Sequence, residues 1–456
     1  MSNVADQIQT ALAEDLPSGW SLASIEDLVG GDGVFVDGDW VESKDQDPTG
    51  DVRLIQLADI GDGVYRNKSD RFLTHEKALE LGCTFLRRDD VLIARMPDPL
   101  GRACIFPGDP KKSVTVVDVA IVRSSNGEFN HRWLMYFINA PVFRTVMASL
   151  QSGSTRKRIS RGNLARITLP VPPREQQNRI VAEIEKQFSR LDEAVANLKR
   201  VKANLKRHKA AVLKAAVEGK LTEEWRKQHP DMEPASKLLE RILTTRRAEW
   251  NGRGKYKEPT PPDTNELPSL PKGWTWATVE QLAAGFVGAI QSGPFGSQLL
   301  HSEFVEDGIL AIGIDNVLDG KFSLGSQHRI TPTKFKILKK FKARPSDVVI
   351  TVMATVGRVC VLPQSLEQAI ITKHCYRITP VPGNVDSDFL AVALRADCST
   401  RRYLFGNVRG QTRPGINGPI LKAAPVSLPP FAEQKEIVAE AELRLSVIEE
   451  LEASVE

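Results

Sequence analysis

Hydrophobic residues after Pro173 recur at a helical spacing over many turns. They fall at alternating steps of three and four residues, or at whole heptads, which is the spacing of a coiled-coil seam. The seam residues are Ile184, Phe188, Leu191, Val195, Leu198, Leu205 and Val212. Lys202 and Lys209 interrupt the seam, and the stretch 199–214 contains seven lysines and arginines but no acidic residue. We therefore predict a long coiled-coil helix within residues 171–229, whose basic half is either a solvated face or a basic track.

The regions on either side of this helix have another pattern, in which short strand-like runs alternate with turns rich in Gly, Asp and Pro. The candidate strands are 53–57, 90–94 and 116–122 in the first region, and 309–314 and 347–352 in the second. A helical stretch follows in each region, near 131–147 and around 389–405. The common order of elements predicts two mixed α/β domains of one fold, and hence an α+β protein.

The remaining segments connect or flank these domains. Residues 1–15 carry Val4, Ile8 and Leu12 at helical spacing, which predicts a short amphipathic helix. For residues 230–270 we expect a helix from Pro234 to Trp250, followed by a linker that contains the Pro-rich stretch 258–262. The expected segments are an N-terminal helix at 1–15, a domain at 16–170, the coiled-coil helix at 171–229, the helix and linker at 230–270, a domain at 271–428 and a distal helix at 429–456.

The two halves of the chain repeat each other. Thr155-Arg156 matches Thr412-Arg413, and the Ile-Val-Ala-Glu sequence that begins at Ile180 recurs at Ile437, with 257 positions between the members of each pair. Known solenoid repeats have periods of roughly 20 to 50 residues, so this one implies duplication of a whole domain and its following helix. We therefore expect a pseudo-twofold symmetric chain. We expect its second coiled-coil helix to be shorter than the first, with Glu456 as the counterpart of Lys199.

Composition narrows the class of protein only modestly. The net charge of +4 is small against 61 basic and 57 acidic residues, so a basic binding surface has to come from local clustering. The five cysteines show no CxxC spacing, which favours reduced thiols over disulfides or zinc ligands. No apolar run approaches the roughly 20 residues of a membrane span, and the N-terminus does not resemble a signal peptide. We expect a cytoplasmic protein that does not contact a membrane.

The sequence lacks the motifs of the enzyme classes that would fit such a chain. A DNA adenine methyltransferase needs Asn or Asp before Pro-Pro-Phe/Tyr, whereas Leu428 precedes Pro429-Pro430-Phe431. The chain has no GxxxxGK[ST] phosphate loop for ATP, and its seven histidines lack metal-binding spacing. We predict no catalytic residue, no metal site and no cofactor.

Four motifs in a fixed order resemble the specificity subunit of Type I restriction-modification systems. They are the Leu-Pro-x-Gly-Trp starts at Leu16 and Leu270, the Gly-x-Thr-Arg-x-x-Ile turns, the Pro-Pro-x-x-x-Gln helix starts, and the segment from Ala216 to Arg226. Ser292-Gly293-Pro294-Phe295-Gly296-Ser297 and Asp37-Gly38-Asp39-Trp40 look like turns of target-recognition domains in that family. The resemblance spans the whole chain.

The resemblance implies two target-recognition domains joined by two long antiparallel coiled-coil helices. It implies that the chain binds double-stranded DNA at a bipartite asymmetric target and docks two methyltransferase subunits and two restriction/translocase subunits. The alternative is a DNA-binding or assembly scaffold of a related methyltransferase system without restriction activity. A salt-dependent DNA-binding assay distinguishes DNA recognition from a purely structural role.

Basic and hydroxyl-bearing loops provide the candidate DNA contacts. The loop 155–161 combines hydroxyls with four cations, which suits phosphate binding, and Arg or Lys also pairs with guanine. A solvated turn is the alternative, and the residues that recur in both halves can instead stabilise the turn. The loop 292–297 offers backbone amides to phosphate, or is simply a tight turn. The candidate DNA-binding residues are Thr155, Arg156, Lys157, Arg158, Arg161, Arg402, Arg409, Thr412, Arg413, Ser292 and Ser297.

Overall fold

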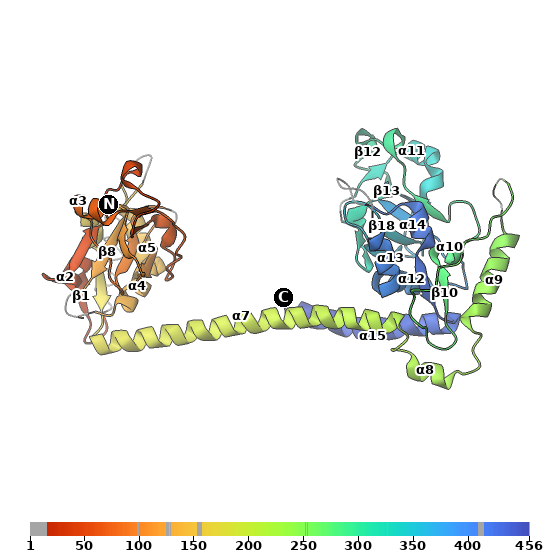
Figure 1. The fold of residues 1–456 in the computed structure, drawn as a ribbon, viewed down its shortest axis with the longest axis horizontal. Coiled ribbons are helices and arrows are strands. Elements are labelled where there is room, and N and C mark those ends of the chain that lie inside the picture. Colours follow the sequence, from red (N-terminus) through yellow and green to blue (C-terminus); the bar gives the residue numbers. More distant parts are fainter. Residues whose placement is uncertain are drawn as a thin grey trace. The chain divides into compact units, whose positions relative to one another are not determined.

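The computed structural model of this chain describes residues 16–97, 100–124, 127, 129–152, 157–250, 252, 254–325, 327–408 and 415–455. The chain divides into two compact units, unit 1 (Met1–Val195) and unit 2 (Ala196–Glu456). Helix α7 (Arg174–Val217) belongs to both, because the boundary falls within it (Figure 1). The helix predicted at residues 1–15 lies outside the described residues.

Unit 1 contains a mixed α/β domain. Its elements are β1 (Ser21–Ser24), α2 (Ile25–Val29), β2 (Val34–Asp37), β3 (Val52–Ile55), β4 (Phe72–Leu73), α3 (His75–Glu80), β5 (Val91–Ala94), β6 (Ala103–Ile105), β7 (Lys112–Thr115), β8 (Val119–Arg123), α4 (His131–Asn139), α5 (Pro141–Ser149), α6 (Arg161–Ala165) and β9 (Thr168–Val171). They form an antiparallel sheet of order β2-β8-β5-β6, a mixed sheet β4-β3-β7 and the antiparallel pair β1-β9.

Unit 2 contains a second domain, preceded by two helices and followed by one. Its elements after α7 are α8 (Glu223–Gln228), α9 (Ala235–Ala248), β10 (Thr275–Thr278), α10 (Val279–Leu282), β11 (Ile290–Ser292), β12 (Phe304–Val305), β13 (Ile309–Ile312), β14 (Val317–Leu318), β15 (Lys321–Phe322), β16 (Arg329–Ile330), α11 (Pro332–Ile337), β17 (Lys342–Ala343), β18 (Val348–Thr351), β19 (Val359–Val361), β20 (Ala369–Ile371), β21 (Cys375–Ile378), α12 (Ser387–Ala396), α13 (Cys398–Gly406), α14 (Gly418–Ala423), β22 (Pro425–Leu428) and α15 (Phe431–Ser454).

The two domains have the same sheet topology. The order β11-β21-β18-β19 matches β2-β8-β5-β6, and the pair β10-β22 matches β1-β9. The mixed sheet β16-β13-β20 matches β4-β3-β7 and is extended by β12 and β17 in unit 2. The prediction of two α/β domains of one fold is therefore confirmed, and unit 2 differs mainly by additional edge strands.

The central strand of each domain is buried on both faces. In β5, Val91 and Ile93 pack in the core with α4 and α5, while Leu92 and Ala94 pack in a second core with residues such as Ile55. Successive side chains of a strand point to opposite faces, so a strand between two cores needs an uninterrupted apolar run. This explains why Val-Leu-Ile-Ala lacks the alternation of a half-exposed strand.

A buried ion pair recurs in both domains. Asp90 lies 2.6 Å from Arg123, and its counterpart Asp347 lies 3.6 Å from Arg377. Both carboxylates also accept a backbone hydrogen bond from three residues upstream, at 2.8 Å in the first domain and 2.7 Å in the second. Burial raises the pKa of Asp347, although the charge of Arg377 opposes that effect. Asp90-Val91 and its counterpart Asp347-Val348 therefore mark a charge-stabilised turn before the central strand.

The Pro-Pro-x-x-x-Gln motif fixes each coiled-coil helix to its domain. Gln177 Oε1 accepts a hydrogen bond from the backbone N–H of Asn130 at 2.7 Å, and its Nε2 donates to the carbonyl of Pro172 at 2.9 Å. Gln434 makes the equivalent bonds to Asp386 at 2.8 Å and to Pro429 at 3.1 Å. Both glutamines are buried, so each amide satisfies backbone groups that water cannot reach.

Within unit 2, α7 and α15 pack as an antiparallel pair. Val217, the last residue of α7, accepts a hydrogen bond from Ser427 just before α15 begins, whereas Lys209 lies 3.1 Å from Glu449 near the end of α15. The ion pair explains why a lysine interrupts the predicted seam at position 209. Ile437, Ala441 and Ile448 are buried on α15, as the predicted register requires.

The earlier part of the seam is exposed in the described structure. Phe188, Leu191, Val195 and Leu198 all lie on the surface, although Tyr136 contacts Phe188 with a ring-centroid distance of 5.9 Å. Only the later part of the seam is therefore covered by α15 among the described residues.

The long helix predicted within 171–229 is α7, and it ends at Val217. Gly219 has φ +68°, and a Cβ atom there would lie 2.9 Å from the Trp274 ring and 3.0 Å from Pro271. The left-handed backbone and the close approach both require glycine, so the chain turns at this position and restarts as α8.

Candidate nucleic-acid interface

The Gly-x-Thr-Arg-x-x-Ile turn is anchored in the same way in both domains. The backbone N–H of Ile159 donates to the carbonyl of Arg95 at 3.1 Å, and that of Ile416 donates to the carbonyl of Val352 at 3.0 Å. Arg95 and Val352 each follow the central strand of their domain, and both isoleucines are buried. The isoleucine of the motif therefore fixes the end of the turn next to the sheet, through its backbone hydrogen bond and its buried side chain.

Three of the candidate cations of unit 1 are brought together on this loop. Lys157, Arg158 and Arg161 are all exposed, and no ion pair involves them within the part of the chain that the structure describes. Arg158 is held by a two-way backbone pairing with Ser152, at 2.9 and 3.0 Å. Thr155 and Arg156 lie outside the described residues. The described part of the loop thus presents unneutralised positive charge on a fixed backbone.

The loop ends in a helix cap that orients its last cation. The side chain of Ser160 accepts a hydrogen bond from the backbone N–H of Asn163 at 3.1 Å, which caps α6. Arg161 is the first residue of that helix and is exposed. A serine before a helix satisfies one of the free N–H groups of the first turn. The Ser160 hydroxyl therefore caps α6.

Buried Arg95 was missed in the sequence analysis. Its Nη1 donates to the carbonyl of Ile159 at 3.1 Å and its Nη2 to that of Val117 at 2.6 Å. Its Nε lies 3.1 Å from Asp37 Oδ1 in an orientation that makes no hydrogen bond, so this contact is one of charge alone. Burial lowers the pKa of Arg95 while the charge of Asp37 opposes that effect.

The Arg95 side chain binds the end of the basic loop in unit 1, whereas its counterpart in unit 2, Val352, has no polar side chain to do so. Val352 occupies the equivalent place in unit 2 and offers only its backbone to Ile416. The signal in the sequence was an arginine directly after a buried strand, which is unusual at a buried position unless it is paired. The two turns consequently share the same backbone hydrogen bond, but only the turn of unit 1 has a buried positive charge next to it.

Comparison with known proteins finds similar sequences and a similar fold. The model of the Type I restriction modification DNA specificity domain matches residues 321–440. The EcoEI specificity subunit of Escherichia coli is 20% identical over 97% of this chain and 80% of its own length, and the EcoBI subunit of the same species is 24% identical over 74% and 63%. The chain is similar to Type I restriction-modification specificity subunits over most of its length. The HsdS subunit from Thermoanaerobacter tengcongensis has the same fold, with a TM-score of 0.55, 17% identity and coverage of 97% of this chain and 93% of that chain.

The candidate DNA-binding residues are more dispersed in unit 2 than in unit 1. Arg402 is exposed on α13, whereas Arg409, Thr412 and Arg413 lie outside the described residues. Ser292 is half-buried at the end of β11, and Ser297 is exposed in a short turn. No hydrogen bond or ion pair joins Arg402, Ser292 and Ser297 in the described part of the chain. These residues do not form one cluster comparable with the loop of unit 1.

The turn at Ser292 has a structural reason for its glycine. A Cβ atom at Gly293 would lie 2.1 Å from the backbone of Thr372. The backbone there passes so close to the neighbouring segment that only glycine fits, which favours the tight-turn interpretation of this motif. Backbone amides nevertheless remain the groups that such a turn offers to an anion.

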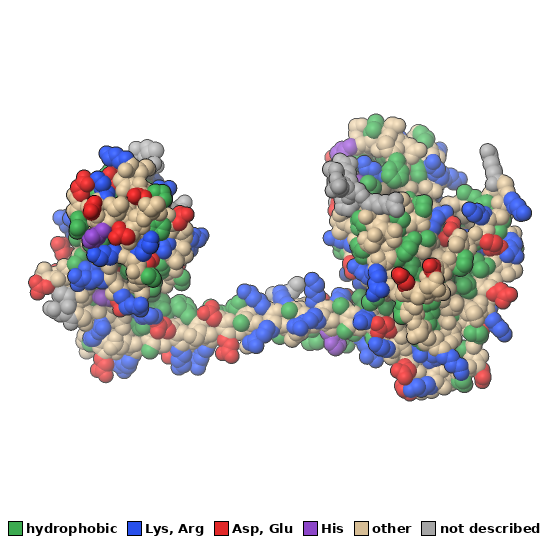
Figure 2. All heavy atoms as spheres, viewed as in Figure 1, with side chains coloured by type: hydrophobic (Ala, Val, Ile, Leu, Met, Phe, Trp, Pro, Cys, Tyr) green, Lys and Arg blue, Asp and Glu red, His purple; other side chains and the backbone are tan. Residues whose placement is uncertain are grey.

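The long helix carries the other concentration of positive charge. Figure 2 shows Lys and Arg side chains gathered along α7, and Lys199, Arg200, Lys202, Lys206 and Arg207 are all exposed. Among the residues described, no group of three or more His, Cys, Asp or Glu side chains could hold a metal ion. None of the helices described is long and apolar enough to cross a membrane.

Proposed function

We propose that this protein is the DNA sequence-specificity subunit of a Type I restriction-modification complex and carries no active site of its own. The observation that carries this proposal is the pair of domains with one topology and one backbone anchor but different side chains at the turn. Each domain binds its own DNA segment, so the target is bipartite and asymmetric. Phosphate contacts position each domain, and side chains that reach the base edges select the sequence.

Unit 1 and unit 2 contact DNA through their Gly-x-Thr-Arg turns. The exposed Lys157, Arg158 and Arg161 in unit 1 supply the charge that phosphate binding requires. Arg402, Arg409 and Arg413 are the proposed contacts in unit 2. The difference between Arg95 and Val352 beneath the two turns supports different half-sites, because the local charge and the support of the loop differ.

The helices bind the methyltransferase subunits. Val201, Leu205, Leu443, Val447 and Leu451 line an apolar groove of about 520 Å³ between α7 and α15. Leu443, Val447 and Leu451 are exposed, and an apolar stripe on a helix pair is the surface onto which further helices pack. The apolar residues from Phe188 to Leu198 provide a second such surface. Two methyltransferase and two restriction/translocase subunits then complete the complex.

The segment after α7 contributes less to docking than the helix pair, because several of its side chains make contacts within unit 2. Thr222 and Arg226 both bind the buried Glu433, at 2.8 and 2.7 Å, and Trp225 stacks on His229 with ring centroids 4.2 Å apart. Thr222 and Arg226 therefore hold the start of α8 against α15, while the Trp225–His229 contact lies within α8 and its C-cap. Exposed Glu223 and Glu224 remain on its surface for a partner.

Mapping methylated adenines tests the proposal. The full chain is assembled with a methyltransferase subunit, incubated with genomic DNA, and the methylated sites are sequenced. We expect two short defined segments separated by a gap of constant length. Exchanging residues 16–170 for those of another specificity subunit should change one segment and leave the other. Salt-independent DNA binding, or methylation without sequence preference, would favour an assembly scaffold instead.

A further inference from the structure

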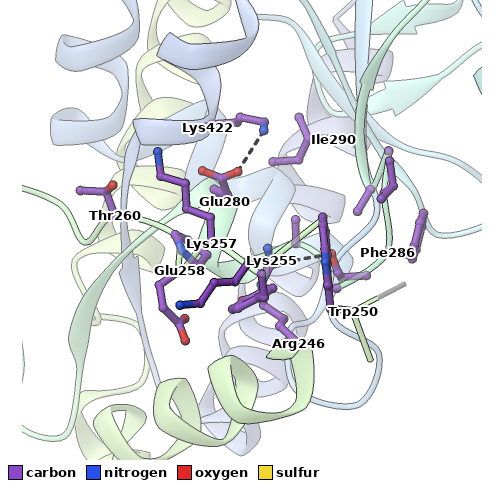
Figure 3. A pocket seen from close by; sticks show the side chains of 18 residues that line it. Arg246, Trp250, Lys255, Lys257, Glu258, Thr260, Glu280, Phe286, Ile290 and Lys422 are labelled. Atoms are coloured by element: carbon purple, nitrogen blue, oxygen red, sulfur yellow. Dashed lines mark hydrogen bonds and ion pairs between the residues drawn. The ribbon is translucent and has the colours of Figure 1, made fainter. Parts of the chain in front are cut away.

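A polar cavity of about 470 Å³ lies where the linker crosses the second domain (Figure 3). It is formed by the end of α9, the linker residues 255–260, the segment from α10 to β11, and Lys422 on α14. Its volume falls in the range of roughly 300 to 1,000 Å³ that small-molecule sites occupy. None of the candidate DNA-binding residues lines it.

The cavity carries an excess of positive charge. Its two acids are engaged, because Glu258 forms an ion pair with Arg247 and Glu280 lies 2.9 Å from Lys422. Arg246, Lys255 and Lys257 also line the cavity, and no carboxylate pairs with them among the residues that the structure describes. Three cations without counter-charge favour an anionic ligand.

Two buried hydrogen-bond donors of the wall lack acceptors. Arg246 is only 8% exposed; its Nη1 donates to the carbonyl of Ala284 at 3.0 Å, but its Nε has no partner in the described structure. The hydroxyl of Tyr256 is likewise buried without a partner. Leaving such groups without a hydrogen bond is energetically unfavourable, so an oxygen-rich occupant that reaches them would stabilise the site.

Aromatic rings form the apolar part of the wall. Trp250 and Tyr256 meet edge to face, with ring centroids 5.7 Å apart, and the Trp250 indole is fixed by a hydrogen bond to the carbonyl of Gly254 at 3.3 Å. Phe286 lines the cavity from the loop after α10. A planar ring that stacks on such a wall is stabilised by its contact with the aromatic faces. The wall therefore suits a ligand with a flat aromatic part.

We propose that this cavity binds a free nucleotide, with its phosphate held by Arg246, Lys255 and Lys257 and its base against Trp250. Phosphate oxygens supply the acceptors that the wall lacks, and the base covers the aromatic surface. The bound nucleotide ties the linker to the second domain, because its contacts come from both. The proposal does not depend on which DNA sequence the protein recognises.

Isothermal titration of the full chain with adenosine 5′-monophosphate tests the site. The double variant Lys255→Gln, Lys257→Gln changes only exposed side chains and should bind the nucleotide at least tenfold more weakly. Trp250→Ala should weaken it by a similar factor. The matched control Lys336→Gln, Lys339→Gln removes two exposed lysines of the same unit and should bind as the parent does. Thermal melting of each variant verifies folding.

Four outcomes would overturn the proposal. No binding of adenosine 5′-monophosphate to the parent chain rejects the site. Equal affinity for inorganic phosphate removes the role of the aromatic wall. Competitive displacement of the nucleotide by duplex DNA identifies the DNA backbone as the phosphate source and excludes a separate nucleotide site. Undiminished binding by the Lys255→Gln, Lys257→Gln variant equally contradicts it.

Discussion

The indole Nε1 of Trp274 donates a hydrogen bond to Oε2 of the buried Glu433 at 2.9 Å. The first-half counterparts, Trp20 and Gln176, make the same bond at 2.9 Å. The two sites nevertheless differ in charge. Glu433 Oε1 also accepts from Arg226 and Thr222, which belong to the segment after α7. A carboxylate is tolerated at this buried position because an arginine and a hydroxyl accompany it.

Replacing Glu433 or Gln176 by alanine should lower the free energy of unfolding by unequal amounts. Glu433→Ala leaves Arg226 without its partner and should lower the free energy of unfolding of unit 2 by about 3–5 kcal/mol. Gln176→Ala removes a neutral, half-buried hydrogen bond and should lower that of unit 1 by about 1 kcal/mol. Urea unfolding followed by tryptophan fluorescence measures both. Equal losses of unfolding free energy in the two variants would show that the Arg226–Glu433 ion pair does not stabilise unit 2.

The stability of unit 1 should depend on pH through His131. Its Nε2 accepts a hydrogen bond from the backbone N–H of Ser124 at 3.3 Å. Burial lowers the pKa of His131 from its ordinary value of 6.5, while the charge of Asp90 opposes this effect. The unfolded chain therefore binds the proton more readily. The stabilising contribution is complete above about pH 6.5 and is lost as the pH falls through the lower folded pKa.

His131→Gln isolates this contribution. Glutamine retains an acceptor for Ser124 but does not titrate. We expect the free energy of unfolding to fall less steeply between pH 7 and pH 5 in the variant than in the parent, as measured by urea unfolding at a series of pH values. Identical slopes would mean that His131 binds protons equally well in both states.

The basic loop of unit 1 should set part of the salt dependence of DNA binding. Replacing Arg156, Lys157 and Arg158 by alanine should reduce affinity. It should also reduce the slope of log affinity against log salt by roughly 1 for each phosphate that the loop no longer neutralises, because fewer counterions are released. Fluorescence anisotropy over a salt series measures this slope.

A charge-matched variant controls for the net loss of three cations. Lys44, Arg66 and Lys68 are exposed elsewhere on unit 1, and their replacement by alanine removes the same charge. The slope of this control should stay near that of the parent. Thermal stability is measured alongside, and an unchanged slope in a stably folded loop variant would remove the loop from the DNA interface.

The apolar groove on the helix pair should bind the methyltransferase subunit. Replacing Leu443, Val447 and Leu451 by serine removes apolar area from the exposed face of α15 and should weaken co-purification with that subunit by at least tenfold. The side chains are 63%, 52% and 49% exposed, so the free chain should keep its melting temperature.

Equally exposed apolar residues elsewhere in unit 2 supply the control. Val287, Leu324 and Ile337 are 64%, 55% and 70% exposed and lie away from α15 in the sequence. Their replacement by serine should leave co-purification unchanged. Equal weakening by both triple variants would indicate a general loss of solubility, and no weakening by the first would exclude the groove as the docking surface.

The length of α7 should control the gap between the two recognised segments. This helix has 44 residues, and inserting one heptad between Val195 and Leu205 preserves the phase of the seam. The insertion lengthens the helix by about 10.5 Å, or roughly three base pairs at about 3.4 Å each. Methylation mapping should find the same half-sites across a longer gap. An unchanged gap in an assembled complex would refute the role of the helix as a ruler.

Sequence repetition determined much of the fold. A duplicated sequence with matched apolar positions has to bury equivalent surfaces, so two α/β domains and two helices followed from the register of the repeat. The motif glutamines Gln177 and Gln434 and the paired acids Asp90 and Asp347 could be recognised as equivalent because each meets nearby backbone groups. Local hydrogen bonding of this kind leaves a short, repeated signature.

Tertiary packing alone decided which distant groups meet. Lys209 and Glu449 are separated by 240 positions, and Arg226 and Glu433 by 207, so no local pattern could pair them. Buried Arg95 donates a hydrogen bond to Ile159, which lies 64 positions later in the chain. The cavity under the linker likewise exists because residues far apart in the chain converge there. The sequence by itself determined the order and kind of elements, through local periodicity and repetition, whereas the burial of individual charges depended on contacts that only the folded chain creates.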